Sequence, residues 1–434
     1  MRKRVNCICL ILAAVLMLTG CMKTVDQLYR LPKRSDEFTE LQITIDEVMA
    51  ELIYCAPRSG VNQQAVQMAD LNGDGTDEYL VYAKSPTQPM LNVLILQQSQ
   101  VGYDLVQQLQ SNGTSFDMVE YAQMDDQPGL ELILGNQLSE SLPCNAEVYT
   151  FSEKLNPDML LSVRYTDFLV PDLNQDQVSE LFLLKSGAKE TDPGVAELYR
   201  MESGALNRTN SVKLSAPAEN LRRVITGCIH GGTPAVFAAT AADDLSLISD
   251  VYILQKDKLI NLTVLGESES SIRTLRSQYV YAEDIDNDGI VELPYLLPMM
   301  PMDDMVSGGK QELIRWYAMK PDGEELVKAY TFHNFIDSWY LQLHEDWAHR
   351  LTVVSKPGAY EFYIWDENFE SAEKVLTIFE SVGNSRRESS VDSSVILLHE
   401  SASLRLTAQL EESAERYDLS AASLKDNFHM IRQY

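Results

Sequence analysis

Short apolar runs separated by turn residues fill the middle of the chain. Four such runs follow Glu78 and four follow Glu180. They span 79–83, 91–97, 103–109 and 116–123, and then 181–184, 195–201, 211–214 and 221–227. The runs lack the 3.6-residue periodicity of an amphipathic helix, and Pro, Gly and Asn punctuate the gaps between them. We therefore predict short antiparallel strands in groups of four.

A motif of about fifty residues recurs along these strands. The segment DLNGDGTDEYLVY at 70–82 returns as DLNQDQVSELFLL at 172–184 and DIDNDGIVELPYLL at 284–297, with weaker echoes at 123–135 and 227–239. The ninth residues of the five copies are spaced by 53, 49, 55 and 57 positions. A fixed period in this range indicates a propeller or a solenoid, and four strands per repeat favour the propeller.

We therefore predict a mainly β fold, a β-propeller of about five four-stranded blades. In this prediction each acidic loop joins the last strand of one blade to the first strand of the next. The run 64–69 has the phase of a fourth strand, so we expect it to pair with the last blade and close the ring without an exposed edge. The alternative is a ring of up to seven blades, which the span 40–434 would accommodate.

Both ends of the repeat region carry other patterns. Apolar residues recur at three- and four-residue steps over 35–53, which predicts a helix with one apolar face and with Ser35 as its N-cap. Further strands are predicted at 339–343, 350–355, 360–365, 375–380, 394–399 and 404–410, with a closing helix at 419–431. We predict one domain at 36–336, the helix plus the propeller, and a small α+β domain at 337–434.

The acidic segments have the ligand spacing of a calcium loop. Side-chain oxygens occupy positions 1, 3, 5 and 9, and position 7 can add its backbone carbonyl oxygen. Ca²⁺ takes six to eight oxygen ligands, so these five positions supply most of a coordination shell. The two full copies are Asp70, Asn72, Asp74, Thr76 and Glu78, and Asp284, Asp286, Asp288, Ile290 and Glu292. A weaker copy, in which Gln177 replaces the glycine of the turn, contains Asp172, Asn174, Asp176 and Glu180.

We expect Ca²⁺ to bind in one or both of the full loops and to have a structural role. The loops at 123–131 and 227–235 have lost most ligands, and we expect no metal there. The alternative is an acidic turn whose side chains accept hydrogen bonds only from its own backbone, as Asp and Asn often do.

These loops resemble the Asp-x-Asn/Asp-x-Asp-Gly-x-x-Asp/Glu loop of FG-GAP and VCBS propellers, the integrin-type repeat. Over the whole chain, the segments DQLYRLPKRSDEF, PRSG at 57–60, LHEDWAHRLTVV and FYIWD resemble uncharacterised lipoproteins of Firmicutes-type bacteria that carry such repeats. The resemblance covers most of the chain and implies no assigned activity.

The N-terminus resembles a bacterial lipoprotein signal. Arg2-Lys3-Arg4 precedes 14 mostly apolar residues, a run too short to span a bilayer comfortably. The run ends in Leu18-Thr19-Gly20-Cys21, which matches a lipobox. The resemblance implies a signal peptide at 1–20, a lipid on the Cys21 thiol and a tether at 21–35. The protein would then be anchored to the cell membrane, facing the extracytoplasmic side.

The net charge of the chain bears on which partners it can bind. The chain of 434 residues has 64 acidic and 35 basic residues, a net charge of −29, which disfavours nucleic acid as a partner. Cys55, Cys144 and Cys228 are far apart in the sequence, which does not decide whether two of them form a disulfide.

Catalytic motifs are absent from the sequence. We find no nucleophile elbow or P-loop, and the histidines at 344 and 349 lack the spacing of a metalloprotease helix, so we predict no enzyme.

We therefore expect a binding or scaffolding module. Its partner would be another envelope protein or an extracellular ligand. The alternative functions are an extracytoplasmic hydrolase and a solute-binding component that uses the propeller face. A solute-binding protein would need two lobes of alternating strands and helices, and this chain lacks that alternation.

Overall fold

The computed structural model describes residues 36–140, 142–189, 191–243, 245–264, 270–299, 312–382 and 395–431. The predicted signal peptide at 1–20, the tether at 21–35 and Cys21 lie outside the described residues. No helix in the described ranges is long and apolar enough to cross a membrane.

The described residues form six antiparallel sheets, numbered here in chain order. Sheet 1 contains β1 (Ile53–Tyr54), β2 (Val66–Ala69), β3 (Glu78–Lys84), β4 (Met90–Ser99) and β5 (Gly102–Asn112). Sheet 2 contains β6 (Ser115–Ala122), β7 (Glu131–Gln137), β8 (Cys144–Phe151) and β9 (Pro157–Tyr165). Sheet 3 contains β10 (Asp167–Leu169), β11 (Leu181–Lys185), β12 (Val195–Glu202) and β13 (Ala205–Lys213).

The second half of the chain follows the same scheme, with four strands in sheet 4 and five in sheets 5 and 6. Sheet 4 contains β14 (Leu221–Ile229), β15 (Thr233–Ala241), β16 (Leu247–Gln255) and β17 (Lys258–Asn261). Sheet 5 contains β18 (Leu293–Pro298), β19 (Glu312–Met319), β20 (Glu325–Asn334), β21 (Trp339–Leu343) and β27 (Phe428–Met430). Sheet 6 contains β22 (Leu351–Lys356), β23 (Ala359–Trp365), β24 (Ala372–Val382), β25 (Ile396–Glu400) and β26 (Leu404–Leu410).

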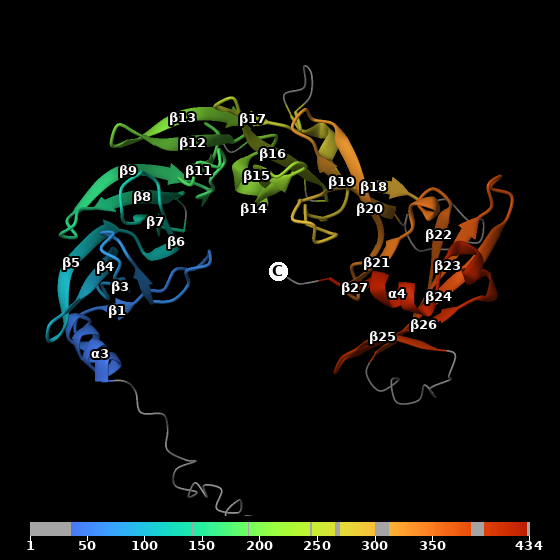
Figure 1. The fold of residues 1–434 in the computed structure, drawn as a ribbon, viewed down its shortest axis with the longest axis horizontal. Helices are drawn as coiled ribbons and strands as arrows, with labels where there is room; N and C mark the ends of the chain where they lie inside the picture. Colours follow the sequence, from blue (N-terminus) through green and yellow to red (C-terminus); the bar gives the residue numbers. More distant parts are fainter. Residues whose placement is uncertain are drawn as a thin grey trace, which may run out of the picture.

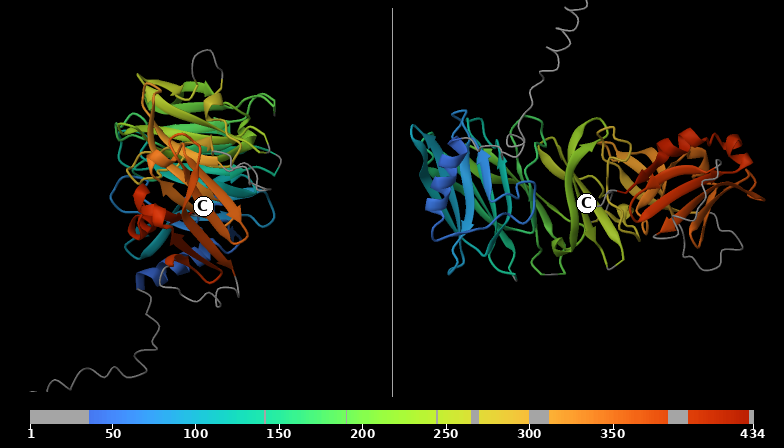
Figure 2. Two further views of the ribbon diagram at one scale, coloured as in Figure 1. Left: turned by 90° about the vertical axis from the view of Figure 1, so that its right-hand side faces the viewer. Right: turned by 90° about the horizontal axis from the view of Figure 1, so that it is seen from below.

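The six sheets follow one another along an arc, which Figure 1 shows face-on and Figure 2 from two further sides. Sheets 2 and 4 run outward from their first strands, β6 and β14, which lie toward the inside of the arc (Figure 1). A buried apolar cluster lies between each pair of consecutive sheets. Face-to-face packing of successive four-stranded antiparallel sheets is the architecture of a β-propeller, so the fold class predicted from the sequence is confirmed.

Packing on both faces explains the composition of the inner strands. In β7 and β11 nearly every residue is buried, because one set of side chains packs on the preceding sheet and the alternate set on the following sheet. The run 181–184, which predicts β11, is therefore continuously apolar rather than alternating.

The predicted closure of the ring by residues 64–69 is wrong. Strand β2 pairs with β3 of its own sheet, with Val66 opposite Val81, and the arc stays open between α3 and β25 (Figure 1). Helix α3 (Asp36–Val48) covers the face of sheet 1 that points away from sheet 2, with Leu41 and Ile45 buried. A terminal repeat has no neighbour on one face, so a helix with a polar outer side takes the neighbour's place.

The predicted position of the acidic loops between blades is also wrong. Ala69 pairs with Glu78, so the first loop is the hairpin between the first two strands of sheet 1. The loops at 123–131 and 172–180 join β6 to β7 and β10 to β11 in the same way. Each sheet therefore begins one strand earlier than we predicted.

The chain after residue 337 continues the packing of the sheets before it. The predicted boundary between residues 336 and 337 falls between β20 and β21, which are hydrogen-bonded neighbours in sheet 5. The predicted closing helix is shorter, α4 (Ala421–Asn427), and is followed by β27, which pairs with β21. Short 3-10 helices at Glu345–Trp347 and Glu412–Tyr417 complete this region.

Candidate metal centre

The two full loops and the weaker loop share one backbone turn. Their fourth and sixth residues have positive φ, 71° and 85° at Gly73 and Gly75, and 58° and 87° at Asn287 and Gly289. The weaker loop reaches the same turn with glutamines, which have φ of 62° and 73° at Gln175 and Gln177. Glutamine at position 6 therefore does not prevent the turn, although φ values in this region are strained for residues with a Cβ.

The aspartate at position 1 holds the turn through backbone hydrogen bonds. The N–H groups of Gly73 and Gly75 donate to the two carboxylate oxygens of Asp70, at 2.7 and 2.9 Å. In the last loop the N–H groups of Asp288 and Gly289 donate to Asp284 in the same way, at 3.0 and 2.9 Å. The side chains at position 5 accept from position 7, where Thr76 and Ile290 lie.

The glutamate at position 9 is buried in every loop that has one. One of its oxygens, Oε2, accepts a hydrogen bond from the backbone N–H of position 2. The donors are Leu71 to Glu78 at 2.9 Å, Met124 to Glu131 at 2.8 Å, Leu173 to Glu180 at 2.8 Å and Ile285 to Glu292 at 3.1 Å. This contact ties the start of the loop to the strand that follows it.

The other glutamate oxygen, Oε1, differs between the full loops and the other two. In the loop at 123–131 and in the weaker loop at 172–180 a protein side chain donates to it: Thr150 to Glu131 at 3.1 Å, and Arg200 to Glu180 at 3.1 Å. In the full loops the Oε1 atoms of Glu78 and Glu292 are buried and have no hydrogen-bond partner among the described residues. A buried unsatisfied oxygen costs about 1–3 kcal/mol, which a bound cation would remove.

The electrostatics of the full loops also suit a cation. Burial, followed by the nearby carboxylates of Asp74 and Asp70, raises the pKa of Glu78 from 4.5 to about 7. Burial, with Asp286 and Asp288 adding to it, raises the pKa of Glu292 to about 7. Burial is the main cause of both shifts, and Ca²⁺ would reverse the like-charge repulsion that adds to it.

The two full loops differ in their charge neutralisation. In the last loop, single oxygens of Asp284, Asp286 and Glu292 lie within 4.8 Å of one another. The ammonium group of Lys328, on β20, contacts Asp288 and lies 3.4 Å from Asp286, and it lowers the pKa of Asp288. In the described part of the chain, no lysine or arginine forms an ion pair with the acids of the first loop.

The sequence could not have identified the side chains that complete these loops. Thr150 and Arg200 lie 19 and 20 residues after the glutamates that they contact, and Lys328 lies 40 residues after Asp288. Each belongs to the third strand of the sheet that contains its loop, which only the strand pairing places beside the loop. Cys55, Cys144 and Cys228 are free thiols in the structure.

No known protein family matches the chain, and no curated protein matches it. Similar solved structures include a protein from Lactobacillus plantarum, at 10% identity and a TM-score of 0.29, covering 75% of this chain and 95% of that one. Sqt1 from Saccharomyces cerevisiae has 8% identity and a TM-score of 0.31, with coverage of 79% and 96%. The exotype rhamnogalacturonan lyase YesX has 12% identity and a TM-score of 0.30, with coverage of 70% and 74%. Similarity this low carries no argument, so the fold is assigned from the strand pairing and sheet packing above.

Proposed function

We propose that the protein is a calcium-stabilised β-propeller module that binds or scaffolds a partner, anchored by lipid on the extracytoplasmic side of the cell membrane. The observation that carries the calcium assignment is the contrast at the position-9 glutamates. In the two full loops Oε1 is buried without a donor, whereas in the loop at 123–131 and in the weaker loop at 172–180 Thr150 or Arg200 donates to it. This distribution favours an ion in the full loops over an acidic turn closed by its own backbone.

Calorimetric titration of the purified protein with CaCl₂ tests the metal site. We expect binding at the first loop, and Asp74→Ala should remove it. Asp176→Ala, the same position in the weaker loop, is the matched control and should leave the binding unchanged. If the two variants bind calcium equally well, the first loop is not the site.

The proposed anchor rests on the sequence alone. The basic start, the short apolar run and the lipobox at Leu18–Cys21 together support lipidation of Cys21. Growth with labelled palmitate should mark the wild-type protein, and Cys21→Ser should abolish the label. Label that persists in this variant would contradict the anchor without affecting the calcium assignment.

The proposed role is binding rather than catalysis, and the partner is an envelope protein or an extracellular ligand. The net charge of −29 argues against nucleic acid. Crosslinking in intact cells, followed by purification from the membrane fraction, tests the scaffolding role. A partner recovered with the wild type and lost from an unanchored Cys21→Ser protein would support it, whereas recovery of no crosslinked partner would contradict it.

A further inference from the structure

Two adjoining cavities lie between sheets 4 and 5, next to the last acidic loop. Their volumes are about 370 and 420 Å³, and they share Arg223, Glu283, His333 and Ile431 as lining residues. Both volumes lie in the range of about 300–1,000 Å³ that is typical of small-molecule sites. The lining residues come from β14, from the segment that precedes β18, from β19, β20 and β21, and from β27 with the residues that flank these strands.

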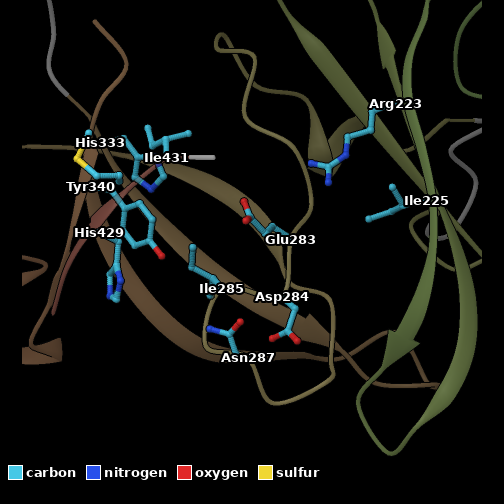
Figure 3. Close-up of a pocket in the computed structure, with 11 residues that line it drawn as sticks. Arg223, Ile225, Glu283, Asp284, Ile285, Asn287, His333, Tyr340, His429 and Ile431 are labelled. Atoms are coloured by element: carbon cyan, nitrogen blue, oxygen red, sulfur yellow. The ribbon is translucent and has the colours of Figure 1, made fainter. Parts of the chain in front are cut away.

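One wall of the first cavity is a column of stacked rings. The Tyr340 ring stacks on His333, with centroids 4.9 Å apart, and on His429, with centroids 4.8 Å apart. His429 reaches this position because β27 pairs with β21. Figure 3 shows Tyr340 and His429 on one side of the cavity and Arg223 on the other, with Glu283 between them.

Aromatic rings form half of the lining of the second cavity. Tyr279 and Phe335 are 38% and 48% exposed, so their rings are accessible at its rim. Tyr281 lies beneath the Arg223 guanidinium at 5.7 Å, and the buried Trp316 contributes to the lining. Flat aromatic surfaces of this kind bind ligands that have an apolar face.

Groups of both signs line the cavities. Arg222 and Arg223 are positive and Glu283 is negative, whereas the carboxylate of Asp284 belongs to the proposed calcium site. A ligand with a single sign of charge would be repelled either by the arginines or by the glutamate, whereas a neutral ligand with donors and acceptors can use both. The mixed lining therefore favours an uncharged polar ligand over an anion or a cation.

His333 points to the same ligand chemistry. Both of its ring nitrogens are buried and have no hydrogen-bond partner in the described part of the chain. Burial lowers its pKa to about 3, so the ring is neutral and adds no charge to the cavities.

We propose that these joined cavities bind a neutral sugar, with the sugar's C–H face on Phe335 and Tyr279 and its hydroxyl groups on Arg223 and Glu283. The proposal deepens the binding function proposed above and rests on it. The last acidic loop contributes Asp284, Ile285 and Asn287 to the cavity lining, so this loop positions part of the sugar site.

Saturation-transfer NMR with the full chain tests the proposal. The probes are glucose, galactose, mannose and N-acetylglucosamine, with glucuronate and glucosamine as charged analogues. We expect at least one neutral sugar to bind, and its charged analogue to bind more weakly. Phe335→Ala should weaken binding by about two- to tenfold through the loss of stacking. Phe369→Ala, another exposed phenylalanine that does not line either cavity, is the matched control and should bind as the wild type does.

Arg223→Met keeps the aliphatic stem and removes the donors, so we expect it to abolish sugar binding. If this variant does not fold, Phe335→Ala still decides the matter. The proposal is overturned if no neutral sugar binds, if the charged analogues bind better, or if Phe335→Ala binds as tightly as Phe369→Ala. Calcium stabilisation measured on the same samples separates the two proposals, because an intact calcium effect without sugar binding refutes only the sugar site.

Discussion

Stabilisation by calcium should depend on pH through the ionisation of Glu78, and substitution of this residue should remove most of that dependence. The folded-state pKa of Glu78 is about 7, against 4.5 for an unburied glutamate. A raised pKa means that the protonated form stabilises the fold. Without calcium, this contribution is therefore fully present below pH 4.5 and is lost as the pH rises through about 7. Calcium requires the ionised form, so its effect runs in the opposite direction and grows with pH.

The expected size follows from the linkage relation. With a Kd of about 10⁻⁴ M, 10 mM calcium stabilises the folded state by about 2.7 kcal/mol at pH 8. At pH 6, competition with one proton of pKa about 7 weakens the apparent affinity roughly tenfold, which leaves about 1.4 kcal/mol. The melting temperature should therefore rise by a few degrees at pH 8 and by about half as much at pH 6.

Glu78→Gln is the decisive variant. Glutamine has the shape of the protonated side chain and can accept the Leu71 hydrogen bond, but it cannot supply the charge. The variant should lose most of the calcium shift at pH 8 and become less sensitive to pH without calcium. Glu131→Gln is the matched control, because Thr150 already occupies that glutamate oxygen. Thermal melts by circular dichroism, with calcium or with EGTA, would refute the reasoning if Glu78→Gln kept the wild-type shift or if the shift were equal at pH 6 and pH 8.

Three further predictions test other parts of the structure. Lys328→Met removes the ammonium group from Asp288, so titration calorimetry should detect tighter calcium binding at the last loop; unchanged affinity there would contradict the competition between lysine and ion. Asp250→Ala leaves several buried donors of sheet 4 unpaired and should lower the free energy of unfolding by about 3 kcal/mol or more in urea. Ile45→Ala should cost about 2–4 kcal/mol by the same measurement, whereas Ile43→Ala, on the exposed side of α3, should cost little.

The strands were predictable because their signal is local. The segments 339–343 and 404–410 match β21 and β26 residue for residue, and most other predicted strands are displaced by at most three residues at either end, but the segment 211–214 covers only the end of β13. The grouping of strands into sheets was not predictable in the same way, because a repeat carries no mark of where its unit begins. We began each unit after the acidic loop, whereas the loop is a hairpin inside the unit.

The buried polar network of sheet 4 had no readable signal in the sequence. Asp250 lies in the apolar strand β16, and it is fully buried. It accepts hydrogen bonds from Ser215, Asn261 and Ser271, which lie 35, 11 and 21 residues away. Only the folded sheet brings these donors together, so the sequence shows an isolated acid in a strand and not the network that stabilises it.

The hydrogen bonds of the first loop determine how large the calcium effect can be. Asp70 already accepts from Gly73 and Gly75, and Glu78 already accepts from Leu71, so the loop has its turn without an ion. Calcium then has two contributions left: it coordinates the buried Oε1 of Glu78, and it neutralises the crowded carboxylates. Chelation should therefore lower the melting temperature while leaving the far-ultraviolet spectrum at 25 °C unchanged. A zinc finger behaves differently, because removal of its metal unfolds it.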